Sequence, residues 1–307
     1  MDIIILLFGF SIGLVLLVKG ADEMVSSAIQ IALKFKLPSS IVGATFIGFG
    51  TSAPELFAST RAALKGDLDL GIGNIVGSNI ANSLLVVAVL YLALPKDYSK
   101  KINLNKISPT WMAILTTIFV STYVLTNKFP FLLGLALLVL VLYVIYKMIS
   151  SESDDEEGLI EEEKSYIWLR GGMSLVATLY GSQLVVENAV EIASIFGVSS
   201  LVIGSTIIAI GTSLPEVAGT ISAAKMRKPD IVFGNIFGSN LFNIGLVGGA
   251  AIMISPGEIS SAIDYQLFIM YFVSFVVIFL SRNIIKRNAI LGYVFIAVYV
   301  LFLISLF

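Results

Sequence analysis

Apolar runs of about 18 to 25 residues, each long enough to cross roughly 30 Å of hydrocarbon as a helix, recur along this chain. A strand of a membrane barrel would be about half as long and would alternate in polarity. The 307 residues are 57% hydrophobic and only 13% charged, which a water-soluble domain could not carry on its surface. The sequence therefore predicts an all-α integral membrane protein embedded in a lipid bilayer.

We expect ten transmembrane helices. They lie near residues 2–33, 39–64, 69–94, 108–126, 129–148, 165–195, 200–224, 230–254, 263–281 and 287–306. The strongly polar stretch "SSESDDEEGLIEEEK" from Ser150 to Lys164 separates the fifth span from the sixth. The predicted organisation is therefore a first half at 1–148, an acidic linker at 149–164 and a second half at 165–307. We interpret the linker as a solvated acidic loop, with a regulatory cation site as the alternative.

Cysteine and histidine are both absent from the sequence. Thiolate chemistry, imidazole bases and His or Cys metal ligation are thereby excluded, and any bound metal must be held by oxygen. An intramembrane protease would need a base beside its serine or a zinc site, and neither is available. We therefore expect no enzyme activity, no cofactor and no nucleic-acid partner.

The basic residues indicate the orientation in the membrane, because loops rich in Lys and Arg stay in the cytoplasm. With the amino terminus outside, fifteen of the 19 basic residues fall in inward loops, and only Arg61, Lys65 and Lys128 fall in outward ones. We expect both termini to be extracellular, the linker 149–164 to be cytoplasmic and the protein to lie in the cell membrane.

The two halves repeat one another at an offset of 161 residues. "GATFIGFGTSAPE" (43–55) matches "GSTIIAIGTSLPE" (204–216) at eight of thirteen positions, and "GNIVGSNIAN" (73–82) matches "GNIFGSNLFN" (234–243) at seven of ten. Because each half has an odd number of spans, the second half enters the membrane from the opposite side. Inverted repeats with interrupted helices at matching positions are typical of transporters whose site lies near the membrane midplane.

The repeated stretches predict broken helices 2, 3, 7 and 8 that carry oxygen ligands. Pro54 and Pro215 lack the amide hydrogen that a continuous helix needs. Thr51 and Glu55 share a helix face because they are four residues apart, as do Ser78 and Asn82. With their repeat mates, eight oxygen-bearing side chains converge: Thr51, Glu55, Ser78, Asn82, Thr212, Glu216, Ser239 and Asn243. Asn79 and Asn240 lie off this face, which leaves them open to a role as hydrogen bonders between packed helices.

The two glutamates constrain the function most. A carboxylate near the bilayer centre costs at least ~2.5 kcal/mol, and intramembrane acids mark ion pathways. Two facing carboxylates would repel each other, and a divalent cation removes both costs. Ca²⁺ accepts six to eight oxygens in adaptable geometry, whereas Mg²⁺ demands a tighter octahedron. The residues therefore indicate a Ca²⁺ site.

At these residues the sequence resembles the cation/calcium antiporter superfamily, in particular its sodium/calcium exchanger branch of prokaryotic type. That branch carries Gly-Thr-Ser-x-Pro-Glu followed by Gly-Asn-x-x-Gly-Ser-Asn in two repeats, and both are present here. The resemblance covers essentially the whole chain. It implies four central ion sites and alternating access in which helices 1 and 6 slide against the bundle.

The resemblance also implies the ligands. It assigns Glu55 and Glu216 to both Ca²⁺ and Na⁺, and Ser78 and Ser239 to Na⁺. It adds oxygen ligands from Thr51, Thr212, Ser52 and Ser213 and from the carbonyls of Gly48 and Ala209. Potassium-dependent relatives carry Asp where Asn243 stands, so Asn82 and Asn243 argue against K⁺ transport and leave two formal negative charges.

We therefore predict an antiporter that exchanges Na⁺ for Ca²⁺, electrogenic, independent of K⁺ and functional as a monomer. The alternatives are a Ca²⁺ antiporter coupled to H⁺, since a carboxylate pair can bind protons, and then a passive cation channel. Sr²⁺ is an alternative substrate.

Overall fold

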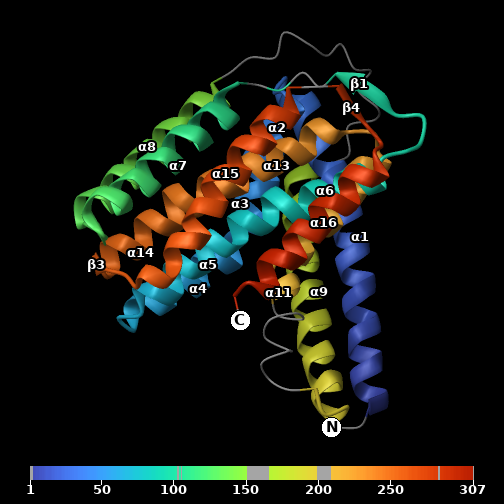
Figure 1. The fold of residues 1–307 in the computed structure, drawn as a ribbon. Helices are drawn as coiled ribbons and strands as arrows, with labels where there is room; N and C mark the ends of the chain where they lie inside the picture. Colours follow the sequence, from blue (N-terminus) through green and yellow to red (C-terminus); the bar gives the residue numbers. More distant parts are fainter. Residues whose placement is uncertain are drawn as a thin grey trace.

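The computed structural model describes residues 3–101, 104, 106–150, 166–198, 209–282 and 284–306. Within these ranges the chain is almost entirely helical, as predicted (Figure 1). The predicted linker 149–164 lies outside the described residues except at its first two positions, and so does the first part of the predicted seventh span.

The first half runs through α1 (Ile3–Phe35), α2 (Ser39–Val42), η1 (Gly43–Gly48), α3 (Phe49–Thr51), α4 (Ala53–Leu64), α5 (Leu68–Ala81), η2 (Asn82–Val86), α6 (Val87–Ala93), α7 (Ile107–Thr126) and α8 (Phe131–Ile149). The second half runs through α9 (Ile167–Ile195), α11 (Ala209–Gly211), α12 (Leu214–Lys225), α13 (Pro229–Phe242), η4 (Asn243–Gly248), α14 (Gly249–Ile254), η5 (Ser261–Ile263), α15 (Asp264–Ser281) and α16 (Ala289–Ile304). Six helices of the described part are long and apolar enough to cross a membrane, or seven if the bent pair 39–51 and 53–64 is one span.

The predicted interruptions take two forms. The second span bends by 46° between Thr51 and Ala53, and the seventh has a matching turn at Ser213 before α12. In each case the proline stands in the first turn of the following helix, where its missing amide hydrogen costs nothing. The third and eighth spans stay continuous but contain the π-helical segments η2 and η4, which begin at the repeat mates Asn82 and Asn243. π-helical turns interrupt the regular ladder and are common at functional sites.

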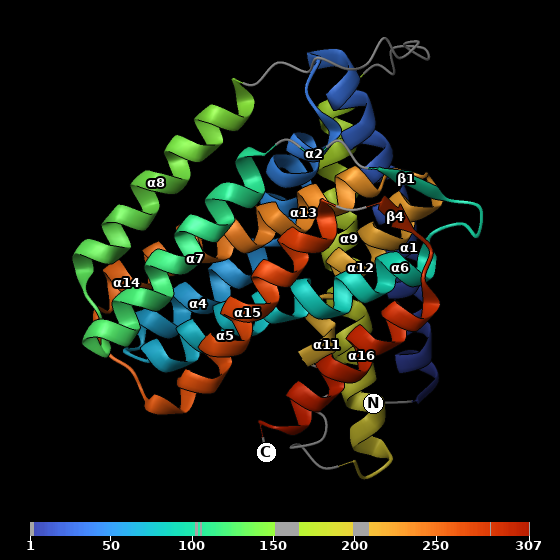
Figure 2. The same cartoon turned by 45° about the horizontal axis from the view of Figure 1, so that its top comes forward.

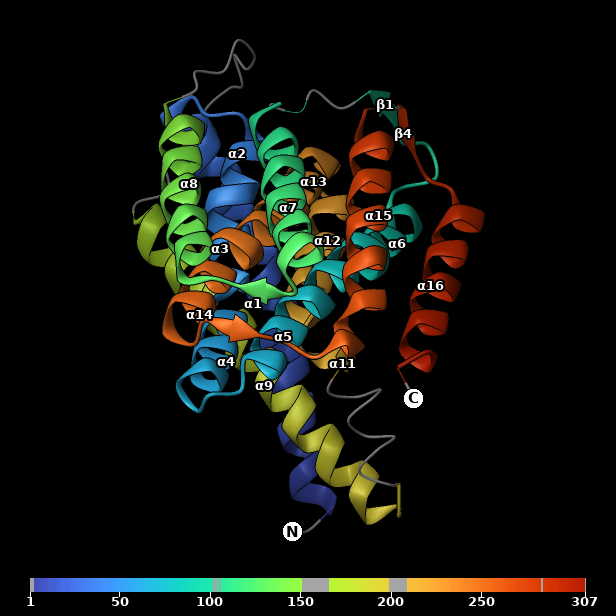
Figure 3. The same ribbon diagram turned by 60° about the vertical axis from the view of Figure 1, so that its left-hand side comes forward.

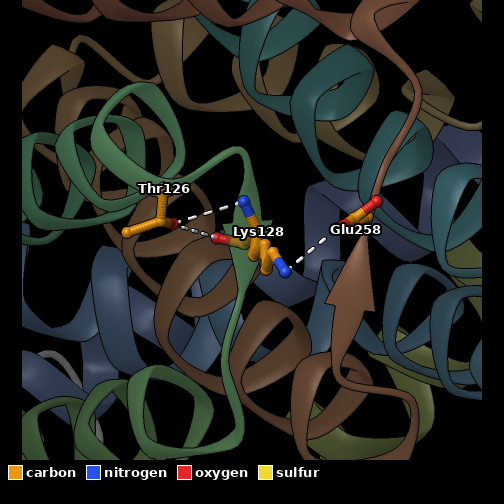
Figure 4. A network of polar contacts seen from close by, with 3 residues as sticks. All are labelled: Thr126, Lys128 and Glu258. Carbon is orange, nitrogen blue, oxygen red and sulfur yellow. Dashed lines mark hydrogen bonds and ion pairs between the residues drawn. The ribbon is translucent and has the colours of Figure 1, made fainter.

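Two short antiparallel sheets, which the sequence analysis did not predict, tie the halves together. Strand β1 (Ser99–Lys101) pairs with β4 (Ile284–Lys286), and β2 (Lys128–Phe129) pairs with β3 (Gly257–Glu258). In the second sheet Lys128 Nζ lies 2.9 Å from Glu258 Oε1, and the Thr126 hydroxyl donates to the Lys128 carbonyl at 3.0 Å (Figure 4). Each sheet thus joins a loop of the first half to a loop of the second.

Helices α1 and α9 form a long pair beside the other helices (Figures 1 and 2). Glycines let their backbones approach, since a Cβ at Gly20 would lie 2.7 Å from the Thr178 amide nitrogen. The first turn of α1 and the last turn of α16 both lie at the end of the bundle away from β1 and β4 (Figure 3).

Glycines also bring α13 against α2 and η1, close to the interrupted centre. A Cβ at Gly234 or Gly238 would fall on the carbonyl oxygens of Ser40 and Ala44, and one at Gly43 would lie 2.5 Å from the Ile231 carbonyl oxygen. The repeat mates of the first two, Gly73 and Gly77, are half-buried and have no described atom within 4 Å of their Cβ positions. The positions that match Ser40 and Ala44, 201 and 205, lie outside the described residues, so this contrast holds for the described part of the chain.

Four left-handed residues also follow the repeat. Gly66 and Gly197 have φ values of 78° and 76°, while their mates Arg227 and Lys36 have φ values of 59° and 52°. A side chain in this conformation is strained. The Arg227 guanidinium donates to Asp97 Oδ2 at 2.7 Å, and this hydrogen bond holds the pKa of the Asp97 carboxyl below its ordinary value. The ion pair therefore fastens the α12–α13 turn to the loop after α6.

The glycine packing predicts a difference in stability between repeat mates. Gly234→Ala should lower the free energy of unfolding by about 1–3 kcal/mol, because the new methyl group overlaps the Ser40 backbone. Gly73→Ala should leave it unchanged or raise it by up to ~1 kcal/mol, since alanine is the better helix former. Equilibrium unfolding in mixed micelles measures both. Equal losses in the two variants would contradict the packing difference.

The left-handed turn predicts that Arg227→Gly is more stable than Arg227→Ala by about 1–2 kcal/mol, because only glycine relieves the backbone strain. Both variants lose the ion pair with Asp97. Since folding lowers the pKa of Asp97, that pair stabilises the protein above the pKa of an unfolded aspartate and stops doing so as the pH falls through the lowered value. The stability that the parent has over Arg227→Ala should therefore shrink in acid, as denaturation at several pH values would test.

Candidate functional site

Glu55 and Glu216 meet at the centre of the bundle. Each lies in the first turn of a helix that starts just after a break, α4 and α12 respectively. The side chains are 4% and 2% exposed, and the two carboxylates are close enough for their charges to interact. Helix amino termini carry partial positive charge, which favours a carboxylate there. One oxygen of each, Oε2, is buried without a hydrogen-bond partner.

Hydroxyl groups surround this pair of carboxylates. Ser78 donates to Glu55 Oε1 at 3.4 Å, and the Thr51 side chain lies near the Glu216 carboxylate. The hydroxyls of Thr51 and Ser52 are buried without a partner. A buried hydroxyl normally finds a partner, so these oxygens are available to a further group.

In the second repeat, Ser213 is buried in the turn before α12. Its neighbour Thr212 is exposed at the same turn. Ser239 donates to the Gly48 carbonyl and to Asn235 Oδ1, both at 3.3 Å, instead of to Glu216 as its mate Ser78 does to Glu55. The two repeats thus present the same groups with different hydrogen bonds.

Four asparagines join the two repeats across the centre. Asn82 Nδ2 donates to Asn240 Oδ1 at 3.2 Å, and Asn243 Nδ2 donates to Asn79 Oδ1 at 3.0 Å. These are repeat-equivalent bonds. Each bond takes one of the two amide hydrogens of Asn82 or Asn243, and Asn243 Oδ1 is buried without a partner. The hydrogen-bonding role open to Asn79 and Asn240 is thus the one they have here.

The two carbonyls predicted as ligands, those of Gly48 and Ala209, differ in what the structure describes of them. The Gly48 carbonyl already accepts hydrogen bonds from the Ser239 hydroxyl at 3.3 Å and from the Ser52 amide at 3.2 Å. Ala209 begins α11, directly after residues that the structure does not describe. The structure therefore brings the side-chain candidates together more clearly than the carbonyl candidates.

The sequence analysis missed a pair beside the site. Asn74 Nδ2 donates to Ser59 Oγ at 2.9 Å, and Ser59 Oγ donates to the Gly71 carbonyl at 3.1 Å. Both residues have polar mates in the second repeat, Asn235 and Thr220. Extending the repeat comparison beyond the two motifs would have found them.

The surroundings of the site are open on one side and closed on the other. On the α4–α5 side, which we call the open side, Pro54 is exposed and Gly73, Asn74 and Gly77 are half-buried. On the α12–α13 side, the closed side, the mates Pro215, Gly234, Asn235 and Gly238 are all buried. Residues 201–208, which match the segment 40–47 that packs against α13, lie outside the described residues, so the contrast is one of exposure alone.

The arrangement offers two formal negative charges and several neutral oxygens. Among the described residues no group of three or more acidic, histidine or cysteine side chains could hold a metal ion. Carboxylate, amide and hydroxyl oxygens in this number suit a hard cation. Uncompensated, the two carboxylates would be costly at this depth in a membrane.

Comparison with known proteins agrees with this geometry. The family model described as sodium/calcium exchanger protein matches residues 5–151 and 166–307. The chain is 38% identical to the putative antiporter CaxA of Alkalimonas amylolytica over 82% of this chain and 81% of that one. It is 30% identical to the sodium/calcium exchanger MaX1 of Methanosarcina acetivorans over 96% of this chain and 97% of that one.

Solved structures show the same relationship. The sodium-calcium exchanger NCX_Mj, soaked with zero Na⁺ and Ca²⁺, superimposes with a TM-score of 0.84 at 27% identity, and the match covers 100% of both chains. A second crystal of that protein, soaked with Na⁺ and Sr²⁺, superimposes with a TM-score of 0.83. The predicted fold and the predicted resemblance are both confirmed, and the chain belongs to the sodium/calcium exchanger protein family.

Proposed function

We propose that this protein exchanges Na⁺ for Ca²⁺ across a membrane by alternating access. The observation that carries the proposal is the pair of buried carboxylates, Glu55 and Glu216, each with an unpartnered oxygen at a repeat-matched helix break. The names of the relatives support the ions, since MaX1 is a sodium/calcium exchanger and NCX_Mj was soaked with Na⁺, Ca²⁺ and Sr²⁺.

The proposed ligands divide by chemistry. Glu55 and Glu216 would bind Ca²⁺ and, in the alternative state, Na⁺, because they supply the negative charge. Neutral oxygens would complete the coordination shells: the side chains of Thr51, Thr212, Ser52, Ser213, Ser78, Ser239, Asn82 and Asn243, and the carbonyls of Gly48 and Ala209. The Gly48 carbonyl must give up its bond from Ser239 to take part.

Exchange follows from the charge of the site. An empty pair of carboxylates is costly to enclose, so the bundle should change sides only when cations compensate it. One Ca²⁺ or several Na⁺ meet this condition. If the Na⁺ ions bring more charge than Ca²⁺, transport is electrogenic, and each net charge moved across 100 mV is worth ~2.3 kcal/mol.

The asparagines support transport without K⁺. Asn82 and Asn243 leave no third carboxylate at the centre, and each has its NH₂ group bonded across the repeats. A second candidate is a Ca²⁺ antiporter coupled to H⁺, because two adjoining carboxylates can bind protons. A passive cation channel is the third, and the inverted repeat favours a carrier over it.

We further propose the orientation that the basic residues indicate. The strands β1 and β4 and the left-handed residues Lys36 and Arg227 would face the cytoplasm, and both termini would lie outside in the cell membrane. The open side of the site, near Gly66, would then face outward. We expect the monomer to be the transporting unit.

Transport in liposomes tests the proposal. Vesicles loaded with Na⁺ and diluted into Na⁺-free buffer at fixed pH should take up Ca²⁺, and Glu55→Gln and Glu216→Gln should each abolish uptake because one negative charge is removed. Glu258→Gln, which changes an exposed acid outside the site, should transport like the parent. Adding K⁺ should not alter the rate.

The counter-ion decides between the candidates. Uptake driven by a pH gradient and indifferent to Na⁺ would replace the Na⁺ proposal with the H⁺-coupled one. Uptake that needs no counter-ion would contradict a carrier altogether. A diffusion potential set with a K⁺ ionophore should change the rate if the exchange is electrogenic.

Ca²⁺ binding is a separate prediction. In detergent, Ca²⁺ should raise the thermal midpoint of the parent, since a ligand that binds only the folded state stabilises it. Glu55→Gln should weaken binding at least tenfold, which corresponds to about 1.4 kcal/mol, and a chelator should reverse the shift. An unchanged shift in Glu55→Gln would place the Ca²⁺ elsewhere, and Glu258→Gln serves as the matched control.

A further inference from the structure

The pair Thr220 and Asn235 differs in its bonding from its repeat mates Ser59 and Asn74. On the open side, Asn74 Nδ2 donates to Ser59 Oγ at 2.9 Å. On the closed side, the Thr220 hydroxyl is buried without a partner, and the Asn235 side chain accepts from Ser239 at 3.3 Å. One repeat therefore has a bond that the other lacks, although both carry the groups to make it.

The free hydroxyl of Thr220 is unusual for a helix in this protein. The buried threonines Thr116 and Thr178 bond back to the carbonyl four residues earlier, each at 2.7 Å, as membrane helices commonly allow. Among the described buried threonines only Thr51 and Thr220 leave the hydroxyl unpaired. Thr51 belongs to the candidate ion site. Thr220 has the same unpaired, buried hydroxyl but is not among the predicted ion ligands.

Thr220 also lies on the same face of α12 as Glu216. It is four residues after Glu216 in α12, so both side chains share one face of that helix. Asn235 precedes Ser239 by four residues in α13 and is bonded to it. These residues therefore extend from the centre along the side that is closed in this structure.

We propose that Thr220 and Asn235 line the route by which the cation leaves the centre on the closed side. When that side opens, the Asn235 side chain turns from accepting the Ser239 hydrogen bond at Oδ1 to donating from Nδ2 to Thr220, as Asn74 Nδ2 already donates to Ser59 on the open side. Ser239, released from Asn235 and Gly48, then donates to Glu216 as Ser78 donates to Glu55. This inference rests on the proposed alternating access and adds residues that the ion ligands do not include.

Two variants at repeat-equivalent positions test whether Asn235 changes its hydrogen-bond partner. Thr220→Val keeps the shape but removes the acceptor needed when the closed side opens, whereas Ser59→Ala removes the acceptor used now. Thr220→Val should shift the equilibrium about fivefold toward the arrangement seen in this structure, and Ser59→Ala should shift it about fivefold away. A factor of about five is the effect of a single hydrogen bond. Thr220→Ser keeps the hydroxyl and should behave like the parent.

The reactivity of a single introduced cysteine measures which side of the site is accessible to solvent. The natural chain has no cysteine, and Gly73 is half-buried on the open side with no described atom within 4 Å of its Cβ position. Gly73→Cys, placed in lipid nanodiscs that expose both faces, should react with a maleimide faster in Thr220→Val than in Ser59→Ala. Equal rates or the reverse order would overturn the proposal.

Transport and binding complete the test. Thr220→Val should lower Na⁺-driven Ca²⁺ turnover about fivefold, leave the thermal shift by Ca²⁺ unchanged, and be restored by Thr220→Ser. Parental turnover in Thr220→Val, or a lost Ca²⁺ shift, would overturn the route. If the parent itself shows no Na⁺-dependent uptake, the proposed function fails, and the order of labelling rates still decides the partner exchange.

Discussion

The structure depends on keeping two carboxylates in the middle of a membrane-spanning bundle. An unpaired charge there is costly, so Glu55 and Glu216 need helix amino termini, hydroxyls and a cation around them. The breaks at Ser52 and Ser213 supply the amino termini, and the repeat places both within reach of each other. The glycine contacts and the asparagine bridges then hold the interrupted helices together.

The inverted repeat places equivalent residues on both sides of one site, and the two sides differ in exposure. Two halves with matching sequences could pack identically, which would leave both sides open or both closed. Here α2 and η1 pack against α13 at Gly234 and Gly238, while the equivalent glycines of α5 are half-buried. Exchanging these two arrangements between the repeats would open the other side without changing the central ligands. In the proposed alternating access, the two sides of the site would exchange these arrangements.

Much of this could be predicted from the sequence, because hydropathy, proline and the repeat act locally. They located the spans, the break at Pro54 and the convergence of Glu55 with Glu216. The two small sheets were missed since strands of two or three residues have no periodicity to read. The differing bonds of Ser78 and Ser239 could not be predicted either, because equivalent residues have equal sequence signals and only the conformation separates them.

The asparagines determine the charge of the site, and that charge determines how the membrane potential would act on transport. With Asn at positions 82 and 243, the side chains at the centre carry two formal negative charges. One Ca²⁺ would neutralise them, and so would two Na⁺. A third Na⁺, held by neutral hydroxyl, amide or carbonyl oxygens, would leave the loaded site with one positive charge. The membrane potential would then act on the Na⁺-loaded step, at ~2.3 kcal/mol per 100 mV, and leave the Ca²⁺-loaded step almost untouched.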